Sequence, residues 1–294
     1  SLNKLQELTE ILLKSGATIQ EINTIRKHID QIKGGGLAKM VYPSRMVTLI
    51  LSDVVSDELS MIASGPTTYD ETSFFDTLEI IKKYDIGNKI PKNISDFLHK
   101  GMRGDVSETV KKGEKYVQNI TNIIVGSISS VIEAAEKTAQ DLGYSTIVLK
   151  KKLIGEASEV GRVEALKFVK MYENENIKKP ICLIAGGETT VTITGDGKGG
   201  RNQELALGAI DQLKNHEQFC LISLATDGED GPTDAAGAFV TGDSMKEANE
   251  KGLDPKTYLR NNDSYSFFDQ INGLIRIGST GTNVNDLLLL FAFE

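Results

Sequence analysis

The chain has 294 residues, of which 39% are hydrophobic and 25% are charged, and its formal net charge is −8. This composition is typical of a globular protein and excludes wholesale disorder. The negative charge argues against a general nucleic-acid binder, which would carry a basic surface. Two cysteines are too few for a disulfide framework and argue against a cysteine-based zinc site. The longest apolar run, 287–293, is too short to cross a membrane, and residues 1–10 do not resemble a signal peptide, so we expect a cytoplasmic protein.

The first part of the chain predicts several helices and one strand. Leucines at helical spacing predict a helix that begins at Leu2 and ends at Gly16. Thr18 and Glu21 fit a capping box, which predicts the start of a second helix. The apolar run 47–51 predicts a buried strand. Residues 74–83 predict a further helix, and residues 91–115 form a charged connection with short helices.

From residue 122 onward, strand and helix patterns alternate. The predicted strands cover 122–125, 146–149, 181–185, 189–194 and 219–225. The predicted helices cover 129–142, 158–172 and 202–213, and 287–291 is a short strand or helix. This alternation predicts an α/β fold of two α/β/α domains with largely parallel, mixed sheets and a cleft between them. We place the domains at 1–152 and 153–294, after the charge run Lys150-Lys151-Lys152, with the polar run 173–179 as the alternative boundary.

Four segments that follow predicted strands combine small residues with carboxylates or hydroxyls. They are residues 52–57, 186–188, 226–234 and 280–286. In open α/β sheets, ligands bind outside the carboxyl ends of the strands. Glycines let backbone N–H groups approach phosphate oxygens, and carboxylates hold magnesium. Ordinary turn chemistry would explain any one segment alone, but the four together predict a site for magnesium and phosphate.

Residues 195–200 match the G-x-G-x-x-G pattern of dinucleotide-binding loops. The segment before this loop alternates between threonine and apolar residues, whereas the strand before a dinucleotide loop is a continuous apolar run. We therefore interpret the loop as a turn that brings Arg201 and the N-terminus of the next helix to an anion. Lys33, beside three glycines, either reaches a phosphate or is a solvated residue at a helix end.

Four segments of the C-terminal half resemble the class of glycerate 2-kinases whose C-terminal part is the MOFRL domain. They are Gly-Gly-Glu-Thr-Thr-Val at 186–191, Gly-Gly-Arg-Asn-Gln-Glu-Leu-Ala-Leu at 199–207, Thr-Asp-Gly-Glu-Asp-Gly-Pro-Thr-Asp-Ala-Ala-Gly-Ala at 226–238, and Thr-Gly-Thr-Asn-Val-Asn-Asp-Leu at 280–287. Upstream, residues 15–17, 22–23, 26–28, 33–35, 51–54 and 62–67 resemble the central region of the same family. The resemblance covers nearly the whole chain, and it implies that the second domain is of MOFRL type.

The resemblance implies ATP-dependent phosphorylation of glycerate at its 2-hydroxyl, with Mg²⁺, to give 2-phosphoglycerate. Arg201 suits a bidentate clamp on a phosphoryl group or on the carboxylate of the substrate. Asp227 and Asp53 are the candidate catalytic carboxylates and magnesium ligands, and their two roles are not assigned individually. The candidate cofactor-binding residues are Lys33, Gly186, Gly187, Glu188, Asn202, Asn283 and Asp286.

This chain also departs from the family pattern. The family has a further stretch before the first helix, with another glycine-rich turn and a lysine expected to work in catalysis. The chain begins after both, so we expect it to be incomplete and weakly active or inactive on its own. Two alternatives stay open: an NAD(P)H-dependent hydroxypyruvate reductase, and a non-catalytic remnant that binds a ligand. The expected partner is a small-molecule substrate, with neither nucleic acid nor membrane, and the sequence is compatible with a homodimer.

Overall fold

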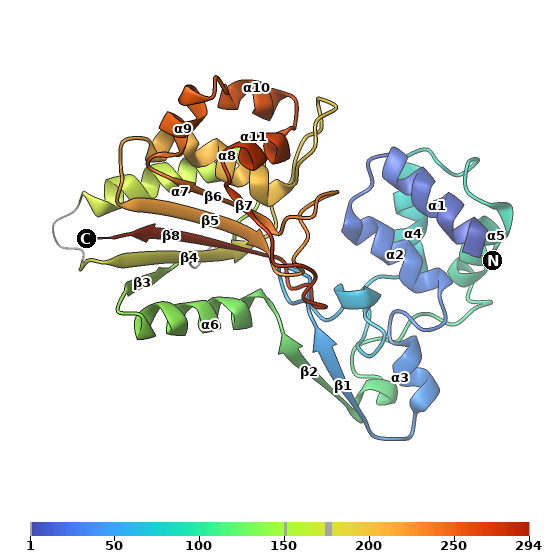
Figure 1. Cartoon of the computed structure of the whole chain (residues 1–294). Helices are drawn as coiled ribbons and strands as arrows, with labels where there is room; N and C mark the ends of the chain where they lie inside the picture. Colours follow the sequence, from blue (N-terminus) through green and yellow to red (C-terminus); the bar gives the residue numbers. More distant parts are fainter. Residues whose placement is uncertain (1, 150–151, 174–177, 294) are drawn as a thin grey trace. The chain divides into compact units, whose positions relative to one another are not determined.

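The computed structural model describes residues 2–149, 152–173 and 178–293 (Figure 1). The chain divides into two compact units, one of residues 1–50 and 56–125 and the other of residues 51–55 and 126–294. This division differs from the one expected at residues 152 and 153, because α6 (Ile128–Asp141) and β3 (Ser145–Val148) pack with the sheet of the second unit. Lys150 and Lys151, on which the expected division relied, lie outside the described residues.

The first unit is mainly helical. Its four longer helices are α1 (Leu2–Lys14), α2 (Ile19–Ile29), α4 (Phe74–Lys83) and α5 (Lys92–Met102). Their apolar faces form one core, whose fully buried side chains include Leu8, Leu12, Ile25 and Leu98. The predicted capping box at α2 is confirmed, since the Thr18 hydroxyl accepts the N–H of Glu21 and the Glu21 carboxylate accepts the N–H of Thr18. The sequence patterns did not predict the short helix α3 (Gly36–Val41).

The strands of the N-terminal half form a separate two-stranded sheet. They are β1 (Met46–Leu51) and β2 (Ile120–Gly126). The N–H of Met46 donates to the carbonyl of Asn119, and the N–H of Ser52 donates to that of Gly126, so the two strands run in the same direction. The last residues of both strands, Leu51 and Gly126, belong to the second unit.

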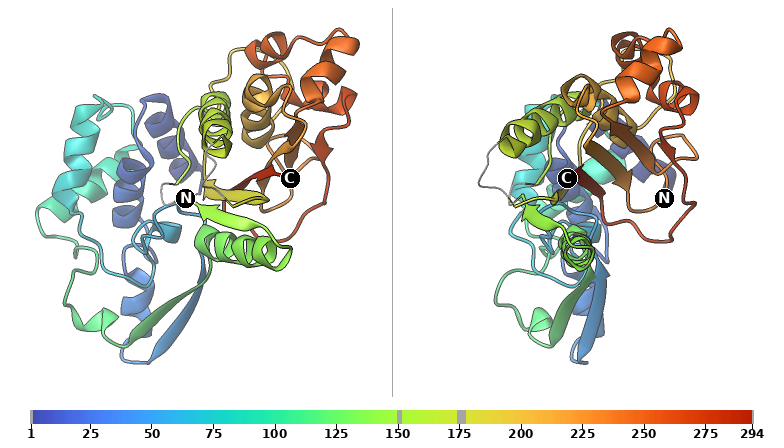
Figure 2. Two further views of the ribbon diagram at one scale, coloured as in Figure 1. Left: turned by 90° about the vertical axis from the view of Figure 1, so that its left-hand side faces the viewer. Right: turned by 60° about the vertical axis from the view of Figure 1, so that its left-hand side comes forward.

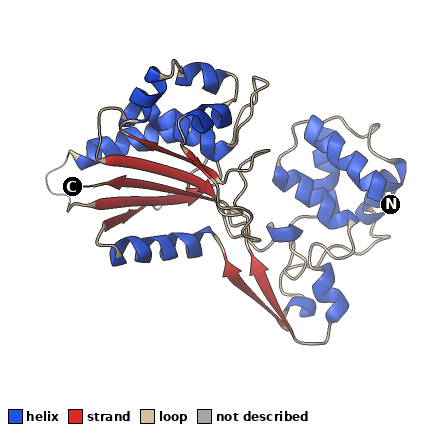
Figure 3. Ribbon diagram, in the orientation of Figure 1, coloured by secondary structure: helices blue, strands red, loops and turns tan. Residues whose placement is uncertain are grey.

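A six-stranded sheet forms the centre of the second unit (Figure 3). Its strands follow the order β3-β4-β8-β5-β6-β7, as the labels in Figure 1 indicate. Besides β3, its strands are β4 (Ile181–Gly187), β5 (Phe219–Ala225), β6 (Gly237–Thr241), β7 (Leu274–Ile275) and β8 (Asp286–Ala292). β3 and β4 are parallel, whereas the other pairings are antiparallel. The expected α/β class with a mixed sheet is confirmed, but two details of the prediction are wrong. The six-stranded sheet is not largely parallel, and the first unit is mainly helical rather than an α/β/α domain. Antiparallel pairs prevail because β8, from the C-terminal end of the chain, enters between β4 and β5 and runs opposite to both.

Helices cover both faces of this sheet (Figures 1 and 2). α6 packs on one face, and α7 (Ala157–Tyr172) and α8 (Arg201–Leu213) pack on the other and against each other. A Cβ at Gly161 of α7 would lie 1.9 Å from the carbonyl oxygen of Leu205, so glycine is required where these two helices approach. The short helices α9 (Ser244–Glu250), α10 (Pro255–Arg260) and α11 (Ser264–Gln270) follow. None of the described helices is long and apolar enough to cross a membrane.

Residues 189–194 do not form the strand that their alternation predicted. Thr190 makes only an isolated bridge with Glu156, and the N–H groups of Thr194 and Gly195 donate to the Asn262 side chain. The hydroxyl of Thr192 donates to the Glu156 carboxylate. The alternating threonines therefore bind to neighbouring loops rather than to an adjacent strand.

Candidate functional site

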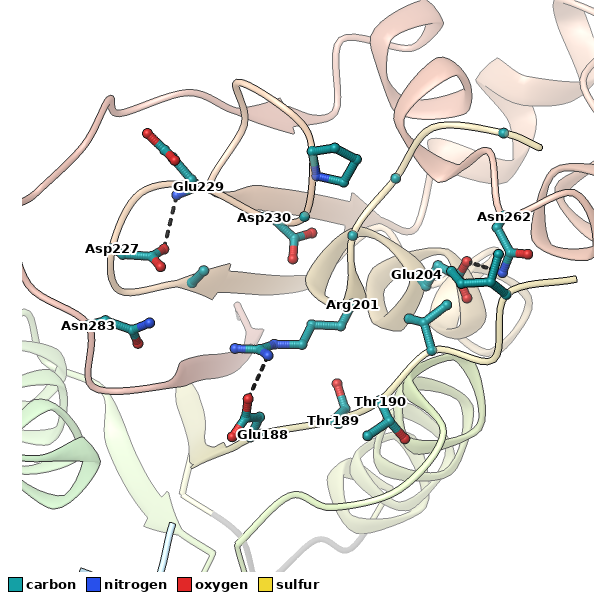
Figure 4. Close-up of a pocket in the computed structure, with 18 residues that line it drawn as sticks. Glu188, Thr189, Thr190, Arg201, Glu204, Asp227, Glu229, Asp230, Asn262 and Asn283 are labelled. Carbon is teal, nitrogen blue, oxygen red and sulfur yellow. Dashed lines mark hydrogen bonds and ion pairs between the residues drawn. The ribbon is translucent and has the colours of Figure 1, made fainter. Parts of the chain in front are cut away.

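A cavity of about 690 Å³ lies at one edge of the six-stranded sheet (Figure 4). β4 and β5 both run antiparallel to β8, so their carboxyl ends meet there, beside the first residue of β8. That residue, Asp286, is the register partner of both Gly187 and Ala225. The expected meeting of strand ends is thus produced by the one strand that is inserted between them. The cavity is lined by the segment that follows β4, the loop before α8, the start of α8, most of residues 225–232, and Asn262 and Asn283.

Arg201 extends from the first turn of α8 into this cavity (Figure 4). Its Nε donates to Asp286 Oδ2 at 2.7 Å, and its Nη2 donates to Asp286 Oδ1 at 3.1 Å. Its third nitrogen, Nη1, donates to Glu188 Oε1 at 2.7 Å. The Asp286 side chain is only 8% exposed, whereas that of Glu188 is 43% exposed. One edge of the guanidinium is therefore anchored in the protein, and the other is paired with an exposed carboxylate.

The electrostatics of the cavity are dominated by carboxylates. Glu188, Glu204, Asp227, Glu229 and Asp230 all line it, and Arg201 is the one basic residue among the described lining residues. Burial raises the pKa of Asp286 to about 6, although the hydrogen bonds from Arg201 oppose this rise. Burial opposes the charge on Arg201, but Asp286 and Glu188 outweigh it, so the pKa of Arg201 lies above its usual value. A strongly anionic ligand would therefore need an added cation to enter this cavity.

The N-terminus of α8 is closed by a carboxylate of the protein itself. Asp230 accepts the backbone N–H groups of Asn202 at 3.1 Å and of Gln203 at 2.9 Å. These are the N–H groups that we expected to meet an anionic ligand, so the expectation for the helix N-terminus is wrong, because these donors already have a partner. The sequence patterns did not single out Asp230. The available signal was Gly200, which stands where a helix normally has a capping side chain.

Comparisons with known proteins place the chain in a family. Residues 181–286 match the model of the MOFRL family, and residues 1–99 match that of a domain of unknown function, DUF4147. The chain is 36% identical to a glycerate kinase of Macaca fascicularis, over 99% of this chain and 83% of that protein. The crystal structure of a glycerate kinase from Thermotoga maritima superposes with a TM-score of 0.89 at 42% identity, covering 99% of this chain and 68% of that one. The chain belongs to the glycerate kinase family.

Two further members of the glycerate kinase family are longer than this chain. A D-glycerate 2-kinase of Thermotoga maritima is 43% identical over 98% of this chain, which spans 66% of its length. A glycerate 2-kinase of Pyrococcus horikoshii is also 43% identical over 98% of this chain, which spans 65% of its length. The chain therefore spans just under two thirds of these two relatives.

Besides Arg201, three of the residues predicted from the glycerate kinase motifs line the cavity, namely Glu188, Asp227 and Asn283. Asp227 Oδ1 accepts the N–H of Glu229 at 3.1 Å, and no described residue bonds to Asp227 Oδ2. Asn283 Oδ1 accepts the N–H of Asn285 at 3.1 Å. Both side chains are thus oriented by the turns that carry them, and Asp227 keeps one oxygen available to a ligand.

Asp53 is connected to this region through Asn285. The backbone carbonyl of Asp53 accepts a hydrogen bond from Asn285 Nδ2 at 2.8 Å, and the same amide lies 3.2 Å from Glu188 Oε2. The Asp53 residue is exposed and is not among the residues that line the cavity. Asn285 is buried, and its Oδ1 has no hydrogen-bond partner among the described residues. Sequence reasoning did not single out Asn285, which adopts a left-handed conformation with φ 71°.

The other predicted residues lie away from the open part of the cavity. A Cβ at Gly186 would lie 2.4 Å from Ile128, and one at Gly187 would lie 2.2 Å from the carbonyl of Leu153, so packing accounts for both glycines. Asn202 is buried and its side chain bonds to Asp230 and to Ser223. Lys33 belongs to the first unit, where its Nζ donates to the carbonyl of Ala63 at 3.1 Å.

The glycine-rich loop 195–200 is bound along the segment that joins α10 and α11. The N–H of Gly197 donates to the carbonyl of Asn261, and the N–H of Lys198 donates to the Asp263 side chain. A Cβ at Gly195 would lie 2.5 Å from Asn261, and one at Gly199 would lie 2.3 Å from the Ser264 hydroxyl. Close packing on 261–264 accounts for these glycines in this member of the glycerate kinase family. Residues 188–194, all of which the structure describes, form no strand directly before the loop, as a dinucleotide site would require.

Proposed function

We propose that this protein transfers the γ-phosphoryl group of ATP to the 2-hydroxyl of glycerate, giving 2-phosphoglycerate and ADP. The supporting observation is the cavity in which Arg201 and Asp227 converge, at the edge of the sheet that carries the family motifs. The identity of 43% to a D-glycerate 2-kinase supports the same reaction. The cytoplasmic location and the small-molecule partner expected from the sequence belong to this proposal.

In this reaction the protein mainly positions the reactants and neutralises charge. The 2-hydroxyl oxygen forms a bond to the γ-phosphorus, the bond from that phosphorus to the bridging oxygen of ADP breaks, and the hydroxyl proton passes to a carboxylate. Arg201 brings a permanently charged guanidinium to the ligand, and its nitrogen that is not bound to Asp286 can donate to a phosphoryl group or to the glycerate carboxylate. We assign the ligand to Nη1, because its present partner Glu188 is exposed while the other two nitrogens are anchored on buried Asp286.

Magnesium fits the donors on one side of the cavity. The described residues contain no group of three or more histidine, cysteine or acidic side chains that could hold a metal ion. Magnesium, however, commonly takes only one or two carboxylates, together with water and substrate phosphates. Asp227 would hold it through Oδ2, with Asn283 beside it and Asp53 as the second candidate ligand. When bound, the ion would screen the phosphate charge that the acidic lining otherwise repels.

The experiment is a turnover and binding assay on the purified protein. With D-glycerate, ATP and Mg²⁺, ³¹P NMR should detect slow formation of 2-phosphoglycerate and ADP, because we expect this chain on its own to be weakly active, and Arg201→Lys should slow it further. Mg-ATP should also raise the thermal midpoint by a few degrees, because a ligand stabilises the state it binds. NADPH should leave the midpoint unchanged. A rise with NADPH together with hydroxypyruvate-dependent NADPH oxidation would replace this proposal by the reductase, and no response to any ligand would favour the non-catalytic alternative.

A further inference from the structure

Helix α8 begins without a capping side chain of its own. Gly200 occupies the N-cap position in the extended conformation usual there, with φ −142° and ψ 173°. A Ser, Thr, Asp or Asn at this position would accept the N–H of the second or third residue of the helix. Here those two N–H groups belong to Asn202 and Gln203, and both donate to the carboxylate of Asp230. The first residue of the same turn is Arg201.

The Asp230 carboxylate occupies the place of the missing side chain. A Cβ built on Gly200 would lie 2.3 Å from Asp230 Cγ and 2.5 Å from each of its two oxygens. The two chain segments also meet closely at the next residue, since a Cβ on Gly231 would lie 2.6 Å from the carbonyl oxygen of Gly199. The glycines on both segments therefore allow a carboxylate from a distant loop to reach the start of the helix.

Asp230 is itself held in one place. Its residue is 2% exposed, and its N–H donates to the carbonyl of Ala235 at 2.7 Å. The Thr233 hydroxyl donates to the carbonyl of Asp230 at 2.8 Å. Asn202 Nδ2 donates to Asp230 Oδ1 at 3.2 Å, and Asn202 Oδ1 accepts the hydroxyl of Ser223 on β5. The first turn of α8 is thus tied both to the 226–234 loop and to the central sheet.

We propose that Asp230 is the positioning residue for Arg201. By capping α8 from another loop, it fixes the first turn of the helix, and with it the place from which Arg201 reaches Asp286 and Glu188. It also closes the helix N-terminus to phosphate, so that an anionic ligand is met by the Arg201 side chain instead. The role of Arg201 in binding a ligand rests on the proposed function. The capping of α8 by Asp230 does not, because it can be measured without any ligand.

The test moves the cap from one segment to the other. Asp230→Ala removes the carboxylate, and the double variant Gly200→Asp with Asp230→Ala places a carboxylate at the ordinary N-cap position, whose nearest obstacle is Asp230 itself. Asp230→Asn, which keeps the shape and one acceptor oxygen, serves if the alanine variant does not fold. The matched control is Asp254→Ala, which removes the exposed cap of α10.

The readouts are the NMR signal of the Arg201 Nε–H group, identified by its loss in Arg201→Lys, and the amide exchange of Asn202 and Gln203. In Asp230→Ala we expect all three to exchange about tenfold faster than in the unaltered protein, since a lost cap opens the first turn. In the double variant, the three exchange rates should return to within about threefold of those in the unaltered protein, because a correctly placed cap closes the first turn again. Asp254→Ala should leave them unchanged.

Two results would overturn the proposal. One is an Asp230→Ala protein, or an Asp230→Asn protein in its place, in which the Arg201 signal is unaltered while the thermal midpoint falls, because Asp230 would then be structural only. The other is a double variant that regains amide protection but not the Arg201 signal. If Mg-ATP and glycerate bind to the unaltered protein, their Kd should rise in Asp230→Ala and recover in the double variant. If these ligands do not bind to the unaltered protein, the proposed function is contradicted. The hydrogen-exchange measurements would still test whether Asp230 positions Arg201.

Discussion

Arg201 and Asp286 form a bidentate ion pair in which Nε and Nη2 donate to the two carboxylate oxygens at 2.7 and 3.1 Å. Arg201 is the first residue of α8 and Asp286 is the first residue of β8, so the pair joins a helix that packs on the sheet to its central, C-terminal strand. It also divides the guanidinium into an anchored edge and the single nitrogen Nη1, which faces exposed Glu188. The predictions for the site follow from this division.

Replacing Arg201 by lysine should impair the reaction although the positive charge is kept. An ammonium group cannot bind Asp286 in a bidentate manner and offer a further donor to a ligand at the same time. We expect kcat/KM for glycerate phosphorylation to fall about tenfold or more, since bidentate sites do not accept lysine as an equivalent. Steady-state kinetics test this, with Arg260→Lys as the control for an exposed arginine outside the cavity. Unchanged kinetics in Arg201→Lys would remove Arg201 from the site.

Glu188→Gln should strengthen the binding of an anion rather than weaken it. Glu188 occupies Nη1 and adds negative charge to an acidic cavity, whereas glutamine keeps the shape and loses the charge. Because solvent screens the repulsion between the Glu188 carboxylate and an anionic ligand, removing this charge should lower the Kd of Mg-ATP by only about three- to tenfold. Titration calorimetry measures it. Glu159→Gln, an exposed change on α7 outside the cavity that also removes a carboxylate paired with an arginine, is the control. Weaker binding in Glu188→Gln would mean that Glu188 itself holds the ligand or its cation.

Asp227→Asn should reduce turnover and leave the fold intact. Asparagine retains an acceptor for the N–H of Glu229, so the turn is preserved. The loss of a carboxylate that accepts a proton or holds the metal should lower kcat by about 10²-fold or more. Kinetics at increasing Mg²⁺ concentration separate the two roles, because excess metal partly restores a lost metal ligand but not a lost base. An Asp227→Asn enzyme with full kcat would show that the site assignment is wrong.

The stability of the second unit should depend on the protonation of Asp286. Burial raises the pKa of this carboxyl to about 6, above the ordinary value of 3.8. The folded state therefore holds the proton to higher pH than the unfolded state, and the contribution to stability is complete below about pH 4. This contribution is lost as the pH rises through about 6. Thermal midpoints from pH 4 to 7 should show the unaltered protein losing stability relative to Asp286→Asn. A relative gain with rising pH would contradict the direction of the shift.

In the first unit, Asp70 should be a major stabilising residue. Asp70 is fully buried, and its Oδ1 lies 3.2 Å from Nζ of buried Lys27. Its carboxylate also accepts hydrogen bonds from the hydroxyls of Thr72 and Thr109. Removing one partner of a buried ion pair leaves the other charge uncompensated, so Asp70→Ala should lower the free energy of unfolding by about 3–5 kcal/mol. The exposed pair of Glu10 and Lys14 is the control, and Glu10→Ala should cost less than about 1 kcal/mol. Denaturant unfolding measures the loss of unfolding free energy in both variants. Equal losses in Asp70→Ala and Glu10→Ala would contradict the prediction.

Sequence patterns succeeded where the structure is set by neighbouring residues. The capping box of Thr18 and Glu21 was predicted from spacing, and the helix predicted at 202–213 is α8, which begins one residue earlier. Asp227 was expected after the end of a buried strand, and it follows β5 in the structure. These features depend on contacts within a few residues, which periodicity and capping signals describe directly.

The same patterns failed where distant segments supply the partner. Residues 189–194 alternate as a strand would, but their threonines bond to Glu156 and to Asn262. The segment 287–291 was equally compatible with strand and helix, and it became a central strand because β4 and β5 pair with it on both sides. In both cases tertiary partners, rather than local propensity, selected the conformation.

For the site, the motifs alone were sufficient to propose Arg201 and Asp227 as candidates and to indicate a family of phosphotransferases. The tertiary structure decided what those residues touch. Arg201 and Asp286 are 85 residues apart, and Asn202 and Asp230 are 28 residues apart. Such contacts exist only once the strand order is set, because β8 carries Asp286 between the ends of β4 and β5. The motifs along the chain indicate which side chains could bind a phosphoryl group. The order of strands in the sheet determines which of these charged side chains lie within reach of each other.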